Sequence, residues 1–256
     1  MRTLSATRYV TPLREGGSLP AIVEAEDDGL YVMKFRGAGQ GEKALIAELV
    51  SGEVARALGL PVPELVFLEL DAAIGRAEPH DEIRDLLNAS VGLNLGLDYL
   101  PGSVTFDPAV GPPLDAKQAS EVVWFDALVT NVDRTARNPN LLLWHRALWL
   151  IDHGASLYFH HASGDVVAAS KSPFAPIRSH VLLPWATELE AADARLQTAL
   201  PRERLEAIAA MIPAAWLKDG AAPDEQRATY VRFLERRLEA SSVFLEEALR
   251  ARAQLV

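Results

Sequence analysis

Two carboxylates and one amide near the middle of the chain are the residue types that metal-assisted transfer of a phosphoryl group requires. Asp133 is followed five positions later by Asn138, and Asp152 begins the triplet Asp152-His153-Gly154. Magnesium prefers oxygen ligands, and the amide carbonyl of Asn138 and the carboxylate of Asp152 both supply them. A separate carboxylate, that of Asp133, can orient an attacking hydroxyl and accept its proton.

A predicted strand hairpin explains how residues this far apart in the chain can meet. The apolar runs Leu141–Trp144 and Ala147–Ile151 are joined by His145-Arg146, which has the length of a tight turn. Because a hairpin returns the chain to where it began, we expect Asn138 to lie near Asp152. The order D-x-x-x-x-N, hairpin, D-x-G is that of the catalytic and metal-binding loops of kinases. Single D-x-x-x-x-N matches are common by chance. The inference of a kinase site therefore depends on both motifs occurring in this order on the two sides of the hairpin.

Each of these residues also has a simpler interpretation. Asp133 could only cap a turn, since Asp and Asn favour such positions. Asn138 precedes Pro139, which allows a purely conformational role, and Asn140 is a competing amide ligand. The triplet that begins at Asp152 could be an ordinary turn. The residues alone leave these alternatives open.

Three features in the first third of the chain suit a phosphate site. Strand 30–35 alternates so that Lys34 shares a face with apolar residues, where it is expected to meet an anion. Glu48 lies on a predicted helix, 42–58, among small residues that let the helix approach a sheet, so we expect it to face Lys34. An edge-strand lysine and a surface glutamate are the simpler alternatives. The segment Gly16-Gly17-Ser18 could turn its backbone N–H groups toward a phosphate, or be a flexible linker.

The predicted elements change in character along the chain. The first hundred residues mix strand and helix signals, whereas the remainder is mainly helical apart from the hairpin. We expect a lobe boundary where the chain leaves a strand and turns, at residues 97–102, and residues 75–90 are ambiguous. Predicted strands are 22–25, 30–35 and 66–70, and predicted helices are 42–58, 115–130, 184–199, 201–211 and 224–252.

Composition and charge exclude several classes of protein. The chain has no cysteine, which excludes disulfides, thiolate zinc sites and cysteine nucleophiles. Its formal net charge of −10 disfavours autonomous nucleic-acid binding, because phosphate contacts need an excess of Lys and Arg. No segment approaches the roughly 20 apolar residues of a membrane span, and the N-terminus lacks the apolar core of a signal peptide. We therefore expect a cytoplasmic protein without a membrane partner.

The chain resembles the HipA-like kinases, which are relatives of the phosphatidylinositol 3- and 4-kinases within the protein-kinase-like fold. The resemblance covers roughly residues 15–160, and the C-terminal hundred residues match only loosely. The segments that carry it are Glu15–Ser18, Tyr31–Phe35, Glu48–Pro63, Tyr99–Gly102, Asn131–Leu143 and Asp152–Gly154.

The resemblance implies a role for each candidate residue. Lys34 is expected to hold ATP phosphates while Glu48 orients it, and Asp133 is expected to be the catalytic base. Asn138 and Asp152 are expected to bind magnesium. The other expected cofactor contacts are the phosphate loop, Gly16, Gly17 and Ser18, and the hinge beside adenine, Tyr99 and Leu100.

The sequence departs from the eukaryotic protein kinases at several positions. It has no full G-x-G-x-x-G-x-V loop, His153 stands where those kinases carry Phe, and Asn131 stands where they carry His. The pair Asp133-Arg134 is more similar to the lipid-kinase relatives. These differences leave the phosphate acceptor open.

These observations predict a single α+β domain, 1–256, with a protein-kinase-like two-lobed fold. A mixed β/α N-lobe, 1–98, and a mainly helical C-lobe, 103–256, are expected to hold ATP and magnesium between them. The predicted activity is transfer of the γ-phosphoryl group to a Ser or Thr hydroxyl of an unknown protein. A small-molecule or lipid kinase and a catalytically silent nucleotide-binding pseudokinase are the alternatives.

Overall fold

A closed five-stranded barrel forms the N-terminal part of the computed structural model, which describes residues 1–13, 19–76, 78–109, 114–161, 165–218 and 220–255. Its strands run in the order β1-β2-β3-β5-β4, and β1 closes the barrel by pairing in parallel with β4. The other neighbouring pairs are antiparallel. The strands are β1 (Thr3–Pro12), β2 (Ala21–Ala25), β3 (Leu30–Lys34), β4 (Leu65–Leu70) and β5 (Gly92–Asp98).

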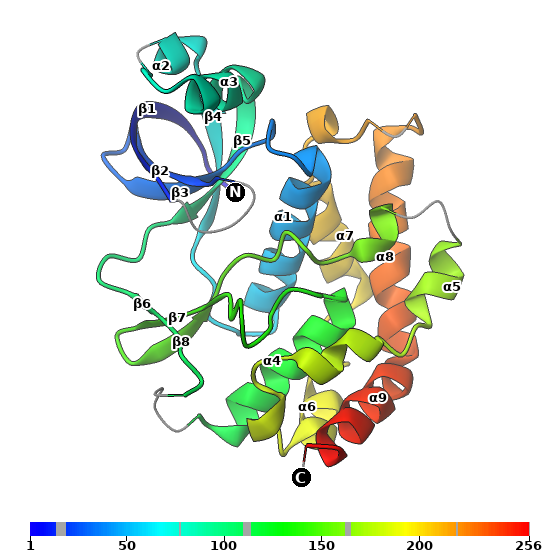
Figure 1. The fold of residues 1–256 in the computed structure, drawn as a ribbon. Helices are drawn as coiled ribbons and strands as arrows, with labels where there is room; N and C mark the ends of the chain where they lie inside the picture. Colours follow the sequence, from blue (N-terminus) through cyan, green and yellow to red (C-terminus); the bar gives the residue numbers. More distant parts are fainter. Residues whose placement is uncertain (14–18, 77, 110–113, 162–164, 219, 256) are drawn as a thin grey trace.

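The predicted hairpin of β2 and β3, the strand β4 and the helix α1 (Gly41–Ala57) are confirmed within one or two residues of their expected ends. Strand β1 was not predicted from the sequence. Only Leu4 and Ala6 of that strand are buried, and its register against β2 shifts twice, so no regular alternation marks it. The ambiguous region around 75–90 contains parts of two short helices, α2 (Ala72–Arg76) and α3 (Asp81–Ala89), which lie over one end of the barrel (Figure 1).

Helices dominate the chain after β5 (Figure 1). Asp115 is the N-cap of helix α4 (Ala116–Val129), as predicted. Its side chain accepts a hydrogen bond from the Lys117 N–H at 3.3 Å. The other helices are α5 (Val166–Ser170), α6 (Leu189–Leu196), α7 (Arg202–Ala210), α8 (Pro223–Glu239) and α9 (Ser241–Ala253), with 3₁₀ turns η1 (Tyr158–His161), η2 (Ala175–Ser179), η3 (Leu183–Trp185) and η4 (Ala214–Trp216).

Two of the predicted helices are wrong in extent. The segment 224–252 is two helices that meet at Ala240, whose backbone (φ −107°) is not helical. A single helix of that length would extend roughly 40 Å, and the turn lets both α8 and α9 pack on α4. The segment 184–199 is likewise shorter, because the η3 turn and Glu188 precede α6.

The hairpin predicted in the middle of the chain is confirmed. Strands β7 (Leu141–Trp144) and β8 (Ala147–Leu150) pair antiparallel, and β6 (Val104–Thr105) adds a third strand. His145 and Arg146 both have positive φ, 48° and 66°, which is the conformation of a tight hairpin turn with the twist of the flanking strands. The turn therefore fixes the register that brings the two ends of the hairpin together.

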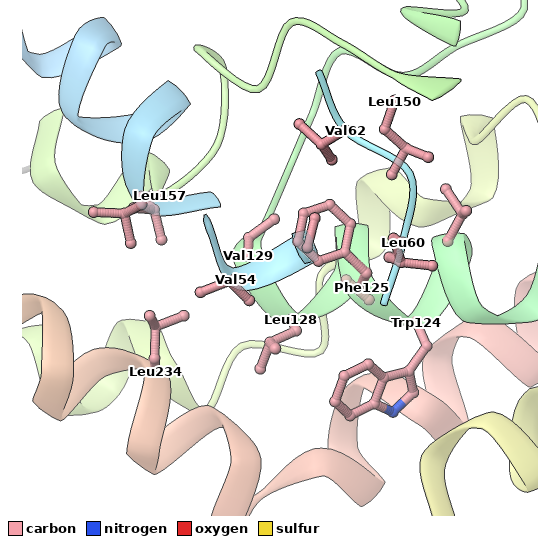
Figure 2. Packing of buried hydrophobic residues seen from close by; sticks show 14 of the residues in the cluster. Val54, Leu60, Val62, Trp124, Phe125, Leu128, Val129, Leu150, Leu157 and Leu234 are labelled. Carbon is pink, nitrogen blue, oxygen red and sulfur yellow. The ribbon is translucent and has the colours of Figure 1, made fainter. Parts of the chain in front are cut away.

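Two hydrophobic cores lie in the molecule. The smaller core fills the barrel and includes Tyr31 and Met33. The larger core joins the helices to α1, to the segment after it and to the hairpin. Figure 2 shows this junction, where Val54 of α1 lies near Phe125 and Leu128 of α4. Helix α1 is therefore anchored in the helical core, although it precedes β4 in the chain.

Candidate active site

Asp133 and Asn138 lie together in the loop between α4 and β7. The Asn138 amide nitrogen donates to Asp133 Oδ2 at 2.8 Å, and the Asn140 amide nitrogen approaches the same oxygen at 3.4 Å. The Thr135 N–H donates to the Asn138 carbonyl at 3.0 Å and closes the turn between them. Because the nitrogen of Asn138 is engaged by Asp133, its side-chain carbonyl oxygen is left as a candidate metal ligand.

Asp152 follows β8 in a strained backbone conformation. Its φ of 56° lies in the left-handed region, which costs a non-glycine residue about 1–3 kcal/mol and is frequent at functional sites. The Ile151 N–H donates to the Asn140 carbonyl at 3.1 Å, so the backbone before Asp152 is joined to the loop that carries Asn138. Asn138 and Asp152 line one cleft, where the sequence analysis expected them to meet.

Lys34 lies between two carboxylates. Its Nζ atom is 2.5 Å from Asp152 Oδ1 and 3.7 Å from Glu48 Oε2. The side chain of Glu48 is only 1% exposed, and its Oε1 accepts a hydrogen bond from His153 Nδ1 at 3.3 Å. Two buried atoms of this cluster, Glu48 Oε2 and His153 Nε2, have no hydrogen-bond partner among the described residues. Unsatisfied buried polar atoms are costly, so this arrangement is suited to change when a ligand enters.

The face of β3 that carries Lys34 differs from the expectation. Tyr31 and Met33 point into the barrel and are buried, whereas Leu30 is exposed and Val32 lines the cleft. The apolar face of the strand is therefore the opposite one, because the sheet closes into a barrel with its own core. Lys34 is screened from solvent by its two carboxylates rather than by an apolar layer.

The charges of this cluster shift the pKa values of its members. Burial alone lowers the pKa of Lys34, but Glu48 and Asp152 outweigh burial and raise it. Burial alone raises the pKa of Glu48, but the charge of Lys34 and the hydrogen bond from His153 hold it below the ordinary value. Burial raises the pKa of Asp133, and the nearby charge of Asp152 adds to that effect. A carboxylate with a raised pKa beside a cleft is suited to accept a proton.

A second buried cluster surrounds Asp126 of α4. Its Oδ1 accepts from Asn131 Nδ2 at 2.9 Å, and its Oδ2 accepts from Arg134 Nε at 2.5 Å and from His180 Nε2 at 2.9 Å. The Leu182 N–H donates to His180 Nδ1 at 3.0 Å, which places the imidazole hydrogen on Nε2. Burial alone raises the pKa of Asp126, but Arg134 and His180 outweigh it and hold that pKa well below its usual range.

Arg134 extends the Asp126 cluster to both loops of the site. One of its terminal nitrogens contacts the Asn140 carbonyl and, at 3.3 Å, the Ile151 carbonyl. The Arg134 carbonyl also accepts from the Val181 N–H at 3.0 Å. This arginine therefore joins the loop with Asp133 to the residue before Asp152 and to the segment that returns after η2.

The cleft between the barrel and the helical part encloses about 1290 Å³. Typical small-ligand pockets enclose roughly 300–1,000 Å³, so this one has room for a nucleotide and part of an acceptor. The Tyr99 N–H donates to the Leu30 carbonyl at 2.9 Å, which fixes the segment after β5 against β3. The predicted contacts Gly16, Gly17 and Ser18 lie outside the described residues. Residues of the cleft wall include Val32, Lys34, Tyr99, Leu100, Asn138 and Asp152.

Three residues of the site were missed or undervalued in the sequence analysis. Asp126 is a charged residue inside the apolar second half of α4, residues 122–129, which is the same signal that identified Lys34. His153 was treated only as a departure from Phe, although a polar residue beside Asp152 could have been expected to need a buried partner. His180 carries no local signal, since its contact with Asp126 spans 54 residues.

Outside the cleft, His160 and His161 form a pair with their Nε2 atoms 3.1 Å apart. No group of three or more His, Cys, Asp or Glu side chains suited to a metal ion occurs in the described ranges. No helix there combines the length and the apolar character that crossing a membrane requires.

Comparisons with known proteins agree on one family and one fold. The family model for HipA-like kinases matches residues 7–245. The structure is similar to that of the proinflammatory kinase CtkA from Helicobacter pylori, with 12% identity, a TM-score of 0.56 and 99% of each chain covered. It is also similar to a Golgi casein kinase with Mn and ADP bound, with 12% identity, a TM-score of 0.50, and coverage of 96% of this chain and 74% of that one. Among curated proteins, none matches the chain.

Proposed function

The chain belongs to the HipA-like kinase family, and we propose that it transfers the γ-phosphoryl group of ATP, with magnesium, to a Ser or Thr hydroxyl of a protein. Membership of the family makes the chain a phosphotransferase, and its structural neighbours give it a protein-kinase-like fold. The observation that supports the finer proposal best is that Lys34, Asn138 and Asp152 line one cleft, with Asp133 held beside them by Asn138. Lys34 contacts Asp152 at 2.5 Å, and Asn138 contacts Asp133 at 2.8 Å.

We also propose that the chain divides at the cleft into an N-lobe, 1–98, and a C-lobe, 103–256. Val32 and Lys34 line the cleft from one side, and Asn138 and Asp152 line it from the other. The segment between the lobes carries Tyr99 and Leu100, which we assign to the hinge beside adenine. Helix α1 shares the larger core with the C-lobe, so the division concerns the cleft and not the packing of every element.

The donor groups present fit a magnesium nucleotide. Asp152 and the carbonyl oxygen of Asn138 are the hard oxygen ligands that magnesium prefers, and Lys34 is a partly buried cation beside Asp152. Bound magnesium supplies neutralisation of the charge on the phosphates. Lys34 is then proposed to exchange part of its contact with Asp152 for phosphate oxygens, while Glu48 holds its ammonium group in place. The loop at Gly16, Gly17 and Ser18 remains a proposed phosphate contact.

Asp133 is the proposed catalytic base. Two amides, Asn138 and Asn140, donate to its Oδ2, which fixes the plane of the carboxylate. Its Oδ1 is then the oxygen that remains to orient the acceptor hydroxyl and take its proton. The raised pKa of Asp133 brings the group closer to the working pH than an exposed aspartate.

Single-turnover assays with γ-labelled ATP test the proposed function. The wild-type chain with magnesium is expected to label protein in a lysate, and EDTA is expected to abolish labelling. Asp133→Asn should keep the rise in melting temperature that ATP and magnesium produce while losing turnover, whereas Asp152→Asn should lose the metal-dependent part of that rise as well. Glu246→Gln, an exposed position on α9, is the matched control.

The same assay separates the classes of acceptor. Labelling of protein Ser or Thr supports the proposal, and labelling confined to a metabolite panel or to phosphoinositide vesicles would move the activity to a small-molecule or lipid kinase. The absence of any nucleotide effect on the melting temperature would contradict the proposal at its first step.

A further inference from the structure

Two exposed arginines lie on chain segments that meet next to the proposed catalytic base, Asp133. Arg137 lies in the loop between Asp133 and Asn138, and Arg178 lies in the 3₁₀ turn η2, which follows the Asp152 loop in the chain. Both side chains are exposed. Neither guanidinium has an ion pair or a side-chain hydrogen bond among the residues that the structure describes.

A backbone bridge brings these two arginines to the same surface. Thr135 pairs with His180 in an antiparallel bridge, and the Val181 N–H donates to the Arg134 carbonyl at 3.0 Å. Arg137 and Arg178 each lie two residues from the bridge, and they lie on the same side of it. Paired Cα atoms are about 5 Å apart and each residue adds at most about 3.6 Å, so the two Cα atoms are within roughly 20 Å of each other. One short extended acceptor segment can reach both.

The stretch of sequence that contains both arginines is basic, although Arg134 within it is buried and paired with Asp126 outside it. Residues 131–182 contain five Lys and Arg against three Asp, a formal charge of +2, whereas the whole chain carries −10. Two of those aspartates, Asp133 and Asp152, belong to the site itself. Several exposed arginines are paired with carboxylates, as Arg2 is with Asp27, whereas Arg137 and Arg178 are not paired with any described residue. Their guanidinium groups are therefore free to bind an anion that approaches this surface.

We infer that Arg137 and Arg178 bind acidic side chains of the acceptor, so that the preferred acceptor is a Ser or Thr flanked within a few residues by Asp or Glu. This inference rests on the proposed function. Arginine suits the role because its planar guanidinium binds carboxylates through two hydrogen bonds. A nucleic acid is the weaker candidate, because it needs many phosphate contacts and the acidic remainder of the chain would repel it.

Twin peptides test the inference. Each pair contains one Ser or Thr with Asp and Glu at the flanking positions in one peptide, and Asn and Gln at those positions in its twin. The full-length chain with magnesium and a non-hydrolysable ATP analogue is titrated with each fluorescent peptide, and phosphorylation is measured in parallel with ATP. The acidic peptide is expected to bind and react about five- to tenfold better, through KM rather than kcat, as two partly exposed charge pairs allow.

The Arg137→Gln, Arg178→Gln double variant is expected to remove that preference and to leave the neutral twin unchanged. Arg204→Gln, an exposed arginine on α7, is the matched control and should keep the preference. Equal binding of the twins by the wild-type chain, or an equal loss for both twins in the double variant, would overturn the inference. Displacement of the acidic peptide by a short single-stranded RNA at a lower concentration than by unlabelled peptide would overturn it in favour of nucleic acid.

Failure of the inference and failure of the proposed function remain distinguishable. The rise in melting temperature with ATP and magnesium reports the nucleotide site without any peptide. If that rise and turnover are present but the twins behave alike, only the acceptor assignment is wrong. If the chain does not respond to nucleotide, the binding titration of the twins still decides whether this surface recognises acidic segments.

Discussion

The buried clusters around Asp126 and Glu48 differ in how completely their carboxylates are paired. Around Asp126, both carboxylate oxygens are engaged, by Asn131 on one side and by Arg134 and His180 on the other. Around Glu48, one carboxylate oxygen lacks a hydrogen bond, and Lys34 is divided between two acids. Both clusters touch the cleft loops, yet only the second exposes its cation to the cleft.

Because of this difference, we expect the Asp126 cluster to support the fold and the Glu48 cluster to take part in the reaction. The Asp126 cluster holds three backbone segments in register, and both oxygens of its carboxylate are already hydrogen-bonded, although one terminal nitrogen of Arg134 has no partner among the described residues. The Glu48 cluster holds a cation and an unsatisfied acceptor in a low-dielectric site, where a bound phosphate can change the balance. We therefore expect mutations in the first cluster to act mainly on stability, and mutations in the second to act mainly on turnover.

The largest expected effect is that of Asp126→Asn. The change leaves the Arg134 guanidinium buried without its counter-charge, and breaking a buried ion pair in this way costs about 3–5 kcal/mol. Urea unfolding should show a large fall in the midpoint at unchanged slope, with Glu246→Gln close to wild type. A fall of less than about 1 kcal/mol would show that the cluster is not the support that its geometry indicates.

Lys34→Met and Glu48→Gln should act mainly on activity and less on stability, the opposite of Asp126→Asn. Each is expected to lower kcat/KM by about 100-fold or more, as the loss of a preorganised electrostatic group does, while the free energy of unfolding falls less than in Asp126→Asn. Because the two residues act as a unit, the double variant should be scarcely slower than the slower single one. Strictly additive losses of activity would show that Lys34 and Glu48 act independently.

The Glu48 cluster also shows how far the sequence could predict the site. Lys34 and Glu48 were expected to meet because a lysine on a strand and a glutamate among small helix residues each need a partner, and they lie 3.7 Å apart. The ordered motif and the hairpin turn likewise identified the loops of Asp133 and Asp152, since turn chemistry is local. Local patterns do not reveal the face that a closed barrel buries, which is why the environment of Lys34 was misjudged.

The Asp126 cluster was harder to predict because its contacts are long-range. His180 meets Asp126 only after the whole loop beyond Asp152 has folded back, and no spacing in the sequence encodes that return. The first strand was missed for a related reason: its pairing with β4 joins residues more than 60 positions apart, and its own alternation is interrupted. No Gly or Pro marks the break between α8 and α9 in the sequence, and both helices pack on α4.

Substitution of His153, the hydrogen-bond partner of Glu48, should lower activity less than substitution of Glu48 itself. His153→Phe keeps an aromatic ring against Phe125 but removes the donor to Glu48, which leaves a buried carboxylate oxygen unpaired at a cost of about 1–3 kcal/mol. Activity is expected to fall roughly tenfold, as when an outer-shell partner is removed. His153→Asn, whose amide can replace the Nδ1 donor, should recover most of the activity although it packs less well. Recovery by Phe but not by Asn would show that the ring, not the hydrogen bond, positions Glu48.

The smallest expected effect is a pH dependence that belongs to the Asp126 cluster. Burial lowers the pKa of His180 below its ordinary value of 6.5, and Arg134 adds to the effect, although Asp126 opposes it. Below pH 6.5 the unfolded chain therefore binds a proton that the native His180 does not, so stability falls as the pH falls from 6.5 toward the folded pKa. The slope from one such group is at most about 1.4 kcal/mol per pH unit. Urea unfolding at pH 7.5 and 5.5 should show a smaller difference in His180→Gln than in wild type, because glutamine can still donate to Asp126 but does not titrate. An equal difference in the two proteins would show that His180 accepts its proton in the folded state, and the buried cluster would then be less closed to acid than its hydrogen bonds imply.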